Sequence, residues 1–360
     1  MVEMISIDKR LKAFEILGRF LLEIGSGNMC LAITDEIILN FCNKLNKLCS
    51  ELKHYNGWYD EVNVRQMLFS LGESLKKEKL LKWVEKYDPS ISELKDEKII
   101  AIVMAGNIPA VGFHDFLSVL ISGNKLLAKL STDDDKLIPA IAELLISIEP
   151  EFKPNIKFTT DPLKSFDAVI ATGSNNTSRY FDYYFSAYPH IIRKNRNGIA
   201  IISGNESDIE LGGLASDIFN YYGLGCRNVS KVFIPENYDF IRLLEVLGKR
   251  KDVSENHKYF NNYEYNKAIF LVNGRKYFDT GNVLLVEDIN IASPISVLNF
   301  EFYSNIGEAK KIIEMDADKI QCVITNNEAF PNRILFGKSQ QPELWEYADG
   351  VDTVEFLLNI

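Results

Sequence analysis

The chain has 360 residues, of which 46% are hydrophobic and 25% are charged, and its formal net charge is −10. This length suits one large or two ordinary domains, and the composition is that of a globular protein with a sizeable core. The negative charge argues against nucleic-acid binding, because neutralising phosphates needs a basic face. The sequence therefore predicts a globular protein without a nucleic-acid partner.

Cysteine and histidine usage fits neither a disulfide framework nor a metal centre. The five cysteines are irregularly spaced and the four histidines lie far apart, so no metal site is expected. The first ten residues lack the basic and apolar regions of a secretory signal. No uncharged apolar run reaches the roughly 18 residues that a membrane span needs. We therefore expect a protein of the reducing cytoplasm with no membrane span.

The first 97 residues are predicted to form a mostly helical region. Apolar residues recur near helical spacing from Asp8 to Glu23, and Thr34 is expected to cap a second helix with two acids in its first turn. A third helix is predicted from Val62 to Tyr87. Cys42 and Cys49 lie beside the apolar stripe of the second helix, so we interpret them as packing residues. No residue in this region suggests chemistry.

Strands alternate with helices after Lys98. Ile99–Met104 is a continuous β-prone apolar run, which is typical of a strand buried on both faces of a parallel sheet. Ser131 is expected to cap a helix whose first turn carries three aspartates. Further strands are predicted at 125–130, 167–172 and 198–203, and a helix at 113–122. This order predicts a doubly wound α/β sheet with its ligand at the carboxyl ends of the strands.

A second α/β domain is predicted after residue 203. Its expected strands lie at 231–234, 268–272, 296–300 and 321–325, with helices near 240–249 and 307–315. The sequence thus predicts four regions: a helical N-terminal region (1–97), a cofactor-binding domain (98–203), a catalytic domain (204–335) and a C-terminal segment (336–360).

One cysteine lies where a fold can present a nucleophile. A helix predicted from Glu210 to Tyr222 runs into Gly223 and Gly225, and Cys226 follows at once. Two glycines let the backbone turn tightly and leave room beside the thiol, and loops commonly carry chemistry. The alternative is a buried, inert cysteine, as most buried cysteines are. These residues alone leave both interpretations open.

Four segments, in order along the chain, resemble motifs of the aldehyde dehydrogenase superfamily. Residues 105–109 (Ala-Gly-Asn-Ile-Pro) resemble the motif that supplies the catalytic asparagine, and residues 122–131 resemble the following turn, strand and cofactor lysine. Residues 171–179 resemble the Gly-Ser cofactor turn, and residues 222–226 (Tyr-Gly-Leu-Gly-Cys) resemble the nucleophile loop.

From Lys98 to the end, including residues 344–350, the chain is most similar to the acyl-CoA reductase family. That family includes the reductase subunit of the bacterial fatty-acid reductase complex in bioluminescence. The resemblance implies an aldehyde-dehydrogenase-like α/β fold, with a Rossmann-type cofactor domain and a second α/β catalytic domain.

The resemblance also assigns two catalytic residues. It implies that Cys226 takes the acyl group and that Asn107, with the Cys226 backbone N–H, forms an oxyanion hole. A thiolate suits this task, because thioester exchange is nearly isoenergetic and sulfur is nucleophilic. The alternative for Asn107 is a turn residue between Gly106 and Pro109. Arg227 either lowers the thiol pKa as a nearby cation or points to solvent.

A nicotinamide cofactor is implied as well, although the chain lacks the Gly-x-Gly-x-x-Gly fingerprint. Many relatives that favour NAD carry a glutamate where this chain has Thr132, and a neutral hydroxyl does not repel a 2′-phosphate. We therefore expect NADPH, with NADH allowed. The alternative for Lys129 and Thr132 is an ordinary solvated strand end. Ser293 and Pro294 replace a Glu-x-x-Gly-Pro run, so the ribose contacts on that side differ. The cofactor contacts expected from the resemblance are Lys129, Ser131, Thr132, Gly173 and Ser174.

The general base of hydrolytic aldehyde dehydrogenases has no counterpart here. Their Glu-Leu-Gly-Gly-Lys motif corresponds to Arg193–Ile202, which contains no acid. Glu210 starts a similar run but lies too close to Cys226. Without a base to activate water, an acyl-enzyme survives for hydride reduction or thiol exchange, which favours reduction over aldehyde oxidation.

The sequence therefore predicts an enzyme that reduces a fatty acyl thioester to a fatty aldehyde with NADPH, through an acyl-Cys226 intermediate. The expected donor is a fatty acyl-CoA or an acyl-protein thioester, with an acyl-protein synthetase as a further partner and a homo-oligomer as the assembly. Two alternatives stay open: an aldehyde dehydrogenase of small aldehydes, and a non-catalytic subunit that binds an acyl carrier or synthetase.

Overall fold

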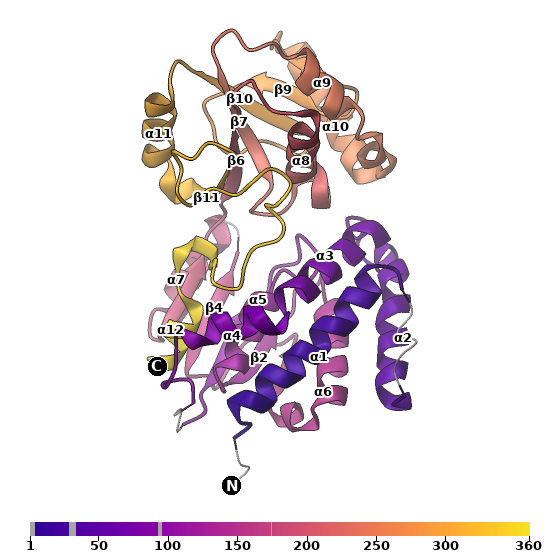
Figure 1. The fold of residues 1–360 in the computed structure, drawn as a ribbon, viewed down its shortest axis with the longest axis vertical. Coiled ribbons are helices and arrows are strands. Elements are labelled where there is room, and N and C mark those ends of the chain that lie inside the picture. The colour runs from indigo at the N-terminus through magenta and orange to yellow at the C-terminus, as the bar shows by residue number, and fades with distance from the viewer. Residues whose placement is uncertain (1–3, 29–33, 93–95, 174) are drawn as a thin grey trace. The chain divides into compact units, whose positions relative to one another are not determined.

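The computed structural model describes residues 4–28, 34–92, 96–173 and 175–360, and the chain divides into two compact units (Figure 1). Unit 1 comprises Met1–Lys194 and Gln341–Ile360, and unit 2 comprises Asn195–Gln340. The chain thus leaves unit 1 once and returns to it with its last twenty residues. The four-region division stays a prediction, because compactness does not test the roles that it assigns.

Unit 1 begins with the expected helical region. Asp35, and not Thr34, caps the second helix: its Oδ1 accepts hydrogen bonds from the N–H groups of Ile37 at 2.9 Å and Ile38 at 3.2 Å. The third predicted helix is two helices, because Lys76 is extended with ψ 142°. The helices are α1 (Ile7–Gly25), α2 (Glu36–Glu51), the 3₁₀ turn η1 (Leu52–His54), α3 (Glu61–Ser74) and α4 (Lys77–Glu85).

The break between α3 and α4 coincides with close helix packing. A Cβ on Gly72 of α3 would lie 2.7 Å from the backbone oxygen of Gly18 in α1, so only glycine lets the two helices approach this closely. Leu75, at the break, is fully buried. Tertiary packing therefore overrides the helical periodicity that runs through this stretch.

A five-stranded parallel sheet follows, with order β3-β2-β1-β4-β5. This is a doubly wound order that reverses direction between β1 and β4, so a ligand crevice is expected where those two strands end. The elements are β1 (Ile99–Val103), α5 (Phe113–Ile121), β2 (Lys125–Lys129), α6 (Leu137–Ile148), the 3₁₀ turn η2 (Pro150–Asn155), β3 (Ile156–Thr159), β4 (Ala168–Thr172), α7 (Asn175–Phe185) and β5 (His190–Arg193).

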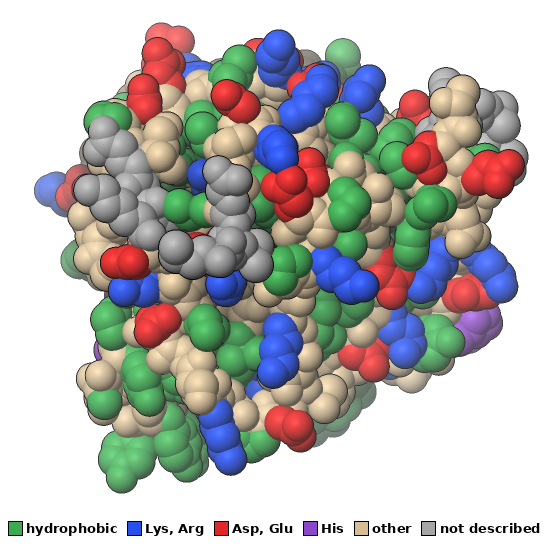
Figure 2. All heavy atoms as spheres, turned by 90° about the horizontal axis from the view of Figure 1, so that it is seen from below, with side chains coloured by type: hydrophobic (Ala, Val, Ile, Leu, Met, Phe, Trp, Pro, Cys, Tyr) green, Lys and Arg blue, Asp and Glu red, His purple; other side chains and the backbone are tan. Residues whose placement is uncertain are grey.

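Apolar contacts and a returning C-terminal segment hold this sheet. Phe181 and Phe185 of α7 pack against alanine and valine side chains of β1 and β4. The 3₁₀ turn η6 (Ala348–Gly350) and α12 (Thr353–Leu358) belong to the returning segment, and Asn124 donates from its amide to the carbonyl of Leu357 at 3.4 Å. On the face drawn in Figure 2, acidic and basic side chains are intermingled.

Unit 2 is a second α/β unit whose six-stranded sheet has the order β11-β6-β7-β10-β9-β8. The strands are parallel except for the pairing of β8 with β9. Its elements are β6 (Asn197–Ile201), α8 (Asp208–Phe219), η3 (Asn220–Gly223), β7 (Val229–Pro235), α9 (Ile241–Gly248), η4 (Lys251–Glu255), α10 (His257–Val272), β8 (Phe278–Asp279), β9 (Leu284–Glu287), β10 (Val297–Tyr303), α11 (Ile306–Met315), η5 (Ala317–Lys319) and β11 (Ile320–Ile324).

The strand predicted at Ala268–Val272 is wrong, since these residues form the last turn and a half of α10. A short apolar run fits a buried strand and a helix end equally well, and here the exposed side chains of Leu271 and Val272 show which one forms. The other strands predicted in this unit are confirmed within a few residues.

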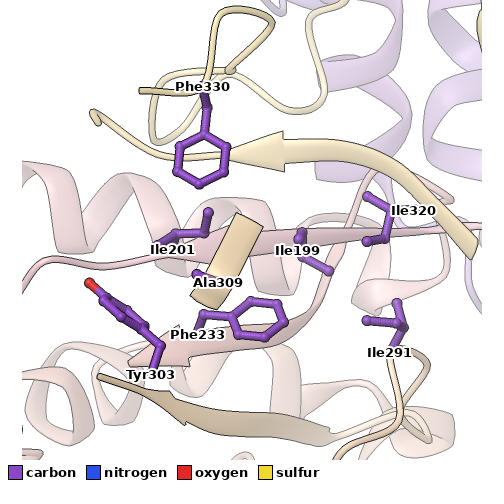
Figure 3. Close-up of a cluster of buried hydrophobic side chains, with 8 residues drawn as sticks. All are labelled: Ile199, Ile201, Phe233, Ile291, Tyr303, Ala309, Ile320 and Phe330. Carbon is purple, nitrogen blue, oxygen red and sulfur yellow. The ribbon is translucent and has the colours of Figure 1, made fainter. Parts of the chain in front are cut away.

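One face of this sheet is closed by a compact apolar cluster (Figure 3). Its members come from β6, β7, β10, β11, α11 and two loops: Ile199, Ile201, Phe233, Ile291, Tyr303, Ala309, Ile320 and Phe330. None of the described helices in either unit is both long and apolar enough to cross a bilayer.

Candidate active site

The carboxyl edge of the unit 1 sheet brings most of the predicted cofactor contacts together. Val103 at the end of β1 pairs with Lys129 of β2 and with Ala171 of β4, so the loops that follow these three strands emerge side by side. The loops carry Asn107, Ser131 and Thr132, and Gly173. Ser174 lies outside the described residues. This edge includes the β1/β4 reversal, where doubly wound sheets bind their ligands.

A buried tyrosine fixes the backbone of the loop that carries Asn107. The Tyr59 hydroxyl lies 3.0 Å from the carbonyl oxygen of Gly106 and 2.8 Å from that of Ile108, so it binds on both sides of Asn107. Tyr59 is fully buried, whereas the side chain of Asn107 is exposed. The backbone is thus fixed while the amide is presented outward.

A buried aspartate fixes the far end of the same loop. Asp134 accepts hydrogen bonds from the N–H of Ala110 at 2.9 Å and from the N–H of Leu137 at 3.3 Å. Ala110 has a φ of 53°, a left-handed conformation that costs a non-glycine residue energy unless its surroundings impose it. Burial raises the pKa of Asp134 to about 6.

The prediction that Ser131 caps a helix is wrong. The Ser131 Oγ accepts a hydrogen bond from the N–H of Asp133 at 3.2 Å within a tight turn, and α6 starts only at Leu137. A Cβ on Gly106 would lie 2.7 Å from the Ser131 Oγ, so the Asn107 loop and the Ser131 turn are in close contact. The catalytic candidate Asn107 and the cofactor candidates Ser131 and Thr132 therefore lie on two segments that pack against each other.

The expected cofactor contacts differ in exposure. Lys129 and Ser131 are half-buried, and Thr132 is exposed between the strand end and α6. A Cβ on Gly173 would lie 2.9 Å from a ring carbon of Phe181, so a glycine is needed where β4 passes into α7. Glycine at a strand-to-helix turn lets a backbone approach a phosphate closely and lets the helix pack on its sheet, so these residues fit a dinucleotide.

Cys226 lies in unit 2, on the loop between α8 and β7. The helix predicted to reach Tyr222 ends at Phe219, because the next residues leave helical geometry. Tyr221, Tyr222 and Gly223 have φ values of 52°, 58° and 75°. Two consecutive left-handed tyrosines are sterically costly, and such strain is concentrated at functional sites.

Asn228, which the sequence analysis missed, holds this strained loop. Its Oδ1 accepts the N–H of Gly225 at 2.8 Å, and its Nδ2 donates to the carbonyls of Asp217 at 2.9 Å and Asn220 at 2.8 Å. Asn228 is 1% exposed, and its own N–H donates to the Gly225 carbonyl at 3.0 Å. Cys226 is half-buried and is the second residue of a turn from Gly225 to Asn228, which the side chain and the backbone N–H of Asn228 both close.

Arg227 is anchored within unit 2. Its Nε donates to the carbonyl of Ser339 at 2.7 Å, so the half-buried side chain is tied to the segment that contains Ser339. β6 supports the loop from the other side, because the Gly198 N–H donates to the Asn228 carbonyl at 2.9 Å. A Cβ on Gly198 would lie 2.7 Å from the Arg227 carbonyl oxygen.

Each carboxylate between residues 194 and 226 already has hydrogen-bonding partners. Glu210 accepts from the Ser207 N–H at 2.6 Å in a capping box, and these bonds hold the pKa of its carboxyl below the ordinary value. The others are Glu206, which binds the N–H groups of residues 203 and 204, Asp208, which pairs with Arg242, and Asp217, which binds those of residues 337 and 339. All four carboxylates therefore have partners of their own within unit 2.

A cavity of about 320 Å³ lies in unit 1 between α4 and the returning C-terminal segment. Its lining includes Trp83, Tyr87 and Tyr347, whose polar atoms bond to one another and to Asp352. It contains none of the predicted site residues. The remaining described cysteines, 42, 49 and 322, are buried, and Cys30 lies outside the described residues.

Comparison with known proteins identifies the family. The family model described as acyl-CoA reductase (LuxC) matches residues 46–249, more than half of the chain. The chain belongs to the acyl-CoA reductase family. As a member, it is an NAD(P)-dependent oxidoreductase that acts on acyl or aldehyde substrates. The match starts inside α2 and ends after α9, whereas the resemblance recognised in the sequence ran from Lys98 to the end, so part of the helical region belongs to the family core.

The solved structures that are similar to this chain include aldehyde dehydrogenases and an oxidoreductase. Aldehyde dehydrogenase 21 from Physcomitrella patens, in complex with the reaction product succinate, is 12% identical, covers 99% of this chain and 89% of its own, and has a TM-score of 0.66. A mutant of aldehyde dehydrogenase C from Pseudomonas syringae, with NAD+ and octanal, is 11% identical over 88% of this chain and 76% of its own, with a TM-score of 0.59. An oxidoreductase from Marinobacter aquaeolei is 9% identical over 90% and 74%, with a TM-score of 0.61.

At these identities the likeness shows the fold alone, and it confirms the predicted aldehyde-dehydrogenase-like α/β class. No curated protein sequence matches the chain.

Removing the Tyr59 hydroxyl is expected to disturb the Asn107 loop. Tyr59→Phe leaves the carbonyls of Gly106 and Ile108 without this donor, which should cost about 1–3 kcal/mol of stability and lower turnover. Tyr87→Phe is the matched control, since that hydroxyl bonds to Asp352 in the same unit, away from the loop. Urea unfolding and steady-state rates check this: equal turnover of the two variants at matched stability would contradict it.

Asn228→Ala is expected to release the Cys226 loop. The change removes three side-chain hydrogen bonds, so we expect a loss of about 1–3 kcal/mol of stability and at least about a tenfold lower rate of reaction at Cys226. Asn299→Ala is the control, because this buried asparagine of unit 2 donates to the carbonyls of Asn290 and Ala292 instead. If both variants react at the wild-type rate well below their melting temperatures, Asn228 does not hold the nucleophile.

Proposed function

We propose that this protein reduces a fatty acyl thioester to a fatty aldehyde through an acyl-Cys226 intermediate. The observation that carries the proposal is the Cys226 loop: a half-buried thiol on a turn that a single buried asparagine fixes, shortly after two tyrosines in the left-handed conformation. An inert packing cysteine needs neither this backbone strain nor the three side-chain hydrogen bonds of Asn228.

The chemistry divides into two steps. In the first, the Cys226 thiolate attacks the thioester carbonyl, and the tetrahedral adduct expels the donor thiolate to leave an acyl-enzyme. In the second, a nicotinamide held by the proposed cofactor residues would supply a hydride to the acyl carbon, which would give a thiohemiacetal alkoxide. Collapse of this alkoxide would break the carbon–sulfur bond, release the aldehyde and regenerate the Cys226 thiolate, with no net gain or loss of a proton in this step.

Asn107 is the proposed oxyanion donor, together with the Cys226 backbone N–H. Support comes from its place at the carboxyl end of β1, on a loop whose backbone Tyr59 and Asp134 fix. Asn107 belongs to unit 1 and Cys226 to unit 2. Their pairing therefore rests on the family resemblance. A preorganised donor of this kind contributes roughly 10²–10³ in rate.

NADPH is the proposed reductant, bound by Lys129, Ser131, Thr132 and the turn that contains Gly173 and Ser174. Thr132 is exposed at the carboxyl edge of β2, and its neutral hydroxyl stands where many NAD-preferring relatives carry a glutamate. The carboxylates nearby, Asp133 and Asp135, are exposed, and the ammonium group of Lys136 lies 3.3 Å from Asp135, which partly offsets its charge.

Aldehyde oxidation is the enzymatic alternative, and the carboxylates weigh against it. Hydrolysis of an acyl-enzyme needs a base to activate water, and the four acids between residues 194 and 226 are all committed to hydrogen bonds. An acyl group on Cys226 would therefore persist until hydride or a thiol reaches it.

The acyl donor is proposed to be a fatty acyl-CoA or an acyl-protein thioester. A synthetase that supplies acyl groups, a homo-oligomeric assembly and a cytoplasmic location complete the proposal. The non-catalytic alternative, a subunit that only binds an acyl carrier or synthetase, predicts that the thiol never carries an acyl group.

The acyl-enzyme can be observed directly. Mixing wild type with a long-chain acyl-CoA is expected to add one acyl mass on Cys226, located by peptide mass spectrometry, and NADPH should discharge it with release of one aldehyde. Cys226→Ser should form no adduct, because an alcohol at neutral pH is a poor nucleophile without a base. Cys42→Ser, at a buried cysteine of unit 1, should behave as wild type.

The outcomes separate the alternatives. An adduct that water discharges without NADPH would favour an aldehyde dehydrogenase. Absence of an adduct with acyl-CoA and with an acyl carrier protein would favour the non-catalytic subunit, and an adduct on Cys226→Ser would place the nucleophile elsewhere.

Thr132→Glu is expected to reverse the cofactor preference. A carboxylate beside the 2′-phosphate should raise the KM for NADPH at least about tenfold, since like charges a few ångströms apart repel by about 1–4 kcal/mol at protein surfaces, and should leave the KM for NADH within about threefold. Thr132→Gln, of the same length without the charge, is the control. Equal effects of the two variants on NADPH would mean that bulk, and not charge, acts at this position.

A further inference from the structure

A second buried carboxylate lies behind the nucleophile loop. Asp217 is on α8, nine residues before Cys226, and is 1% exposed. Its Oδ2 accepts the N–H of Gly337 at 2.6 Å, and its Oδ1 accepts the N–H of Ser339 at 3.0 Å. Burial raises the pKa of Asp217, and the two N–H groups oppose that shift. A buried charge is costly unless it is hydrogen-bonded, so the bonds from Gly337 and Ser339 offset the cost of burying this carboxylate.

The segment that Asp217 holds, residues 336–340, lies directly on α8. A Cβ on Gly213 would be 2.8 Å from the backbone carbon of Phe336, so glycine is required for the segment to lie this close to the helix. Gly337 has a φ of 81°, which turns the chain so that the N–H groups of Gly337 and Ser339 both face the Asp217 carboxylate. Backbone packing and charge thus fix the same five residues.

The segment in turn holds the residue next to the nucleophile. The Ser339 carbonyl accepts the Arg227 Nε at 2.7 Å, and Ser339 is fully buried. One residue further along the loop, the Asp217 backbone carbonyl accepts a hydrogen bond from the side-chain amide of Asn228 at 2.9 Å. Asp217 therefore reaches the two residues that follow Cys226: Asn228 through its main chain, and Arg227 through its side chain and Ser339.

We propose that Asp217 is a positioning residue for the Cys226 nucleophile, and that it orients the thiol by holding residues 336–340 against the Arg227 side chain. The inference deepens the proposed function and rests on it. Asp217 touches neither substrate nor cofactor in this role; it fixes a segment more than a hundred residues downstream, to which the nucleophile loop is tied. A purely structural carboxylate would stabilise unit 2 without affecting the thiol.

Two reactions of Cys226 distinguish these roles. Alkylation by iodoacetamide needs access to the thiol, whereas acyl transfer from acyl-CoA also needs orientation. Asp217→Asn replaces one acceptor oxygen by a donor, so one of the Gly337 and Ser339 N–H groups loses its partner and the segment loosens. We expect Cys226 to be alkylated at least about fivefold faster and acylated at least about tenfold slower than in wild type, with the KM for acyl-CoA changed less than about threefold.

Controls separate orientation from stability. Asn299→Ala, compared at equal distance below its melting temperature, should leave both rates near wild type. Arg227→Met keeps the side-chain stem but removes the donor to Ser339, so it should reproduce both shifts while Asp217 is intact, and it serves if Asp217→Asn does not fold. Wild-type rates in both Asp217→Asn and Arg227→Met, or equal slowing in Asn299→Ala, would overturn the inference.

The two proposals fail differently. If wild type forms no acyl adduct at Cys226, the proposed function fails, and the alkylation rates still report whether Asp217 governs access to the thiol. If wild type forms the adduct and the variants acylate at the wild-type rate, the proposed function stands and the positioning role of Asp217 does not.

Discussion

The nucleophile loop depends on one constraint, which is that a chain leaving a helix must enter a buried strand within a few residues while keeping a thiol accessible. Tyr221 and Tyr222 meet it in a left-handed conformation that costs on the order of 1–3 kcal/mol each. Burying their rings returns roughly 1.5–3 kcal/mol each, and the three bonds of Asn228 add about 0.5–1.5 kcal/mol each. Ring burial is thus of the same size as the backbone strain, and the hydrogen bonds of Asn228 add to it, so burial and hydrogen bonding together hold the left-handed conformation.

Sequence reasoning succeeded where burial alone decides the structure. β1, β2, β4 and β6 are buried on both faces, so their apolar runs mark them without help from the rest of the chain. It failed where packing competes with periodicity: the end of α10 has the composition of a strand, and the boundary between α3 and α4 is set by contact with α1. Thr34 and Asp35 are both good caps, and only the geometry of the first turn chooses Asp35.

The candidate site shows the same division between signals that are local in the sequence and contacts that only the packing of the chain creates. Glycines beside a cysteine indicate a loop, and Cys226 does lie on one, because that signal is local. Asn228 gave no signal, since an asparagine before a strand reads as a turn residue and nothing in the sequence shows that its amide is buried. Asp217 and Ser339 are more than a hundred residues apart, and their hydrogen bond follows from how α8 and the segment 336–340 pack. Long-range polar contacts of this kind carry no periodicity that could be recognised in advance.

Each half of the proposed site is built within its own unit. The Asn107 loop is fixed by Tyr59 and Asp134, which belong to unit 1, and the Cys226 loop is fixed by Asn228, Asp217 and residues 336–340, which belong to unit 2. The contacts that shape the thiol turn therefore lie within unit 2. In the proposed reaction the acyl group arrives before the hydride, and a turn held in this way would let Cys226 accept the acyl group whether or not the nicotinamide is bound. The hydrogen bonds of the four carboxylates between residues 194 and 226 fit the same proposal, in which water lacks a base at the acyl-enzyme.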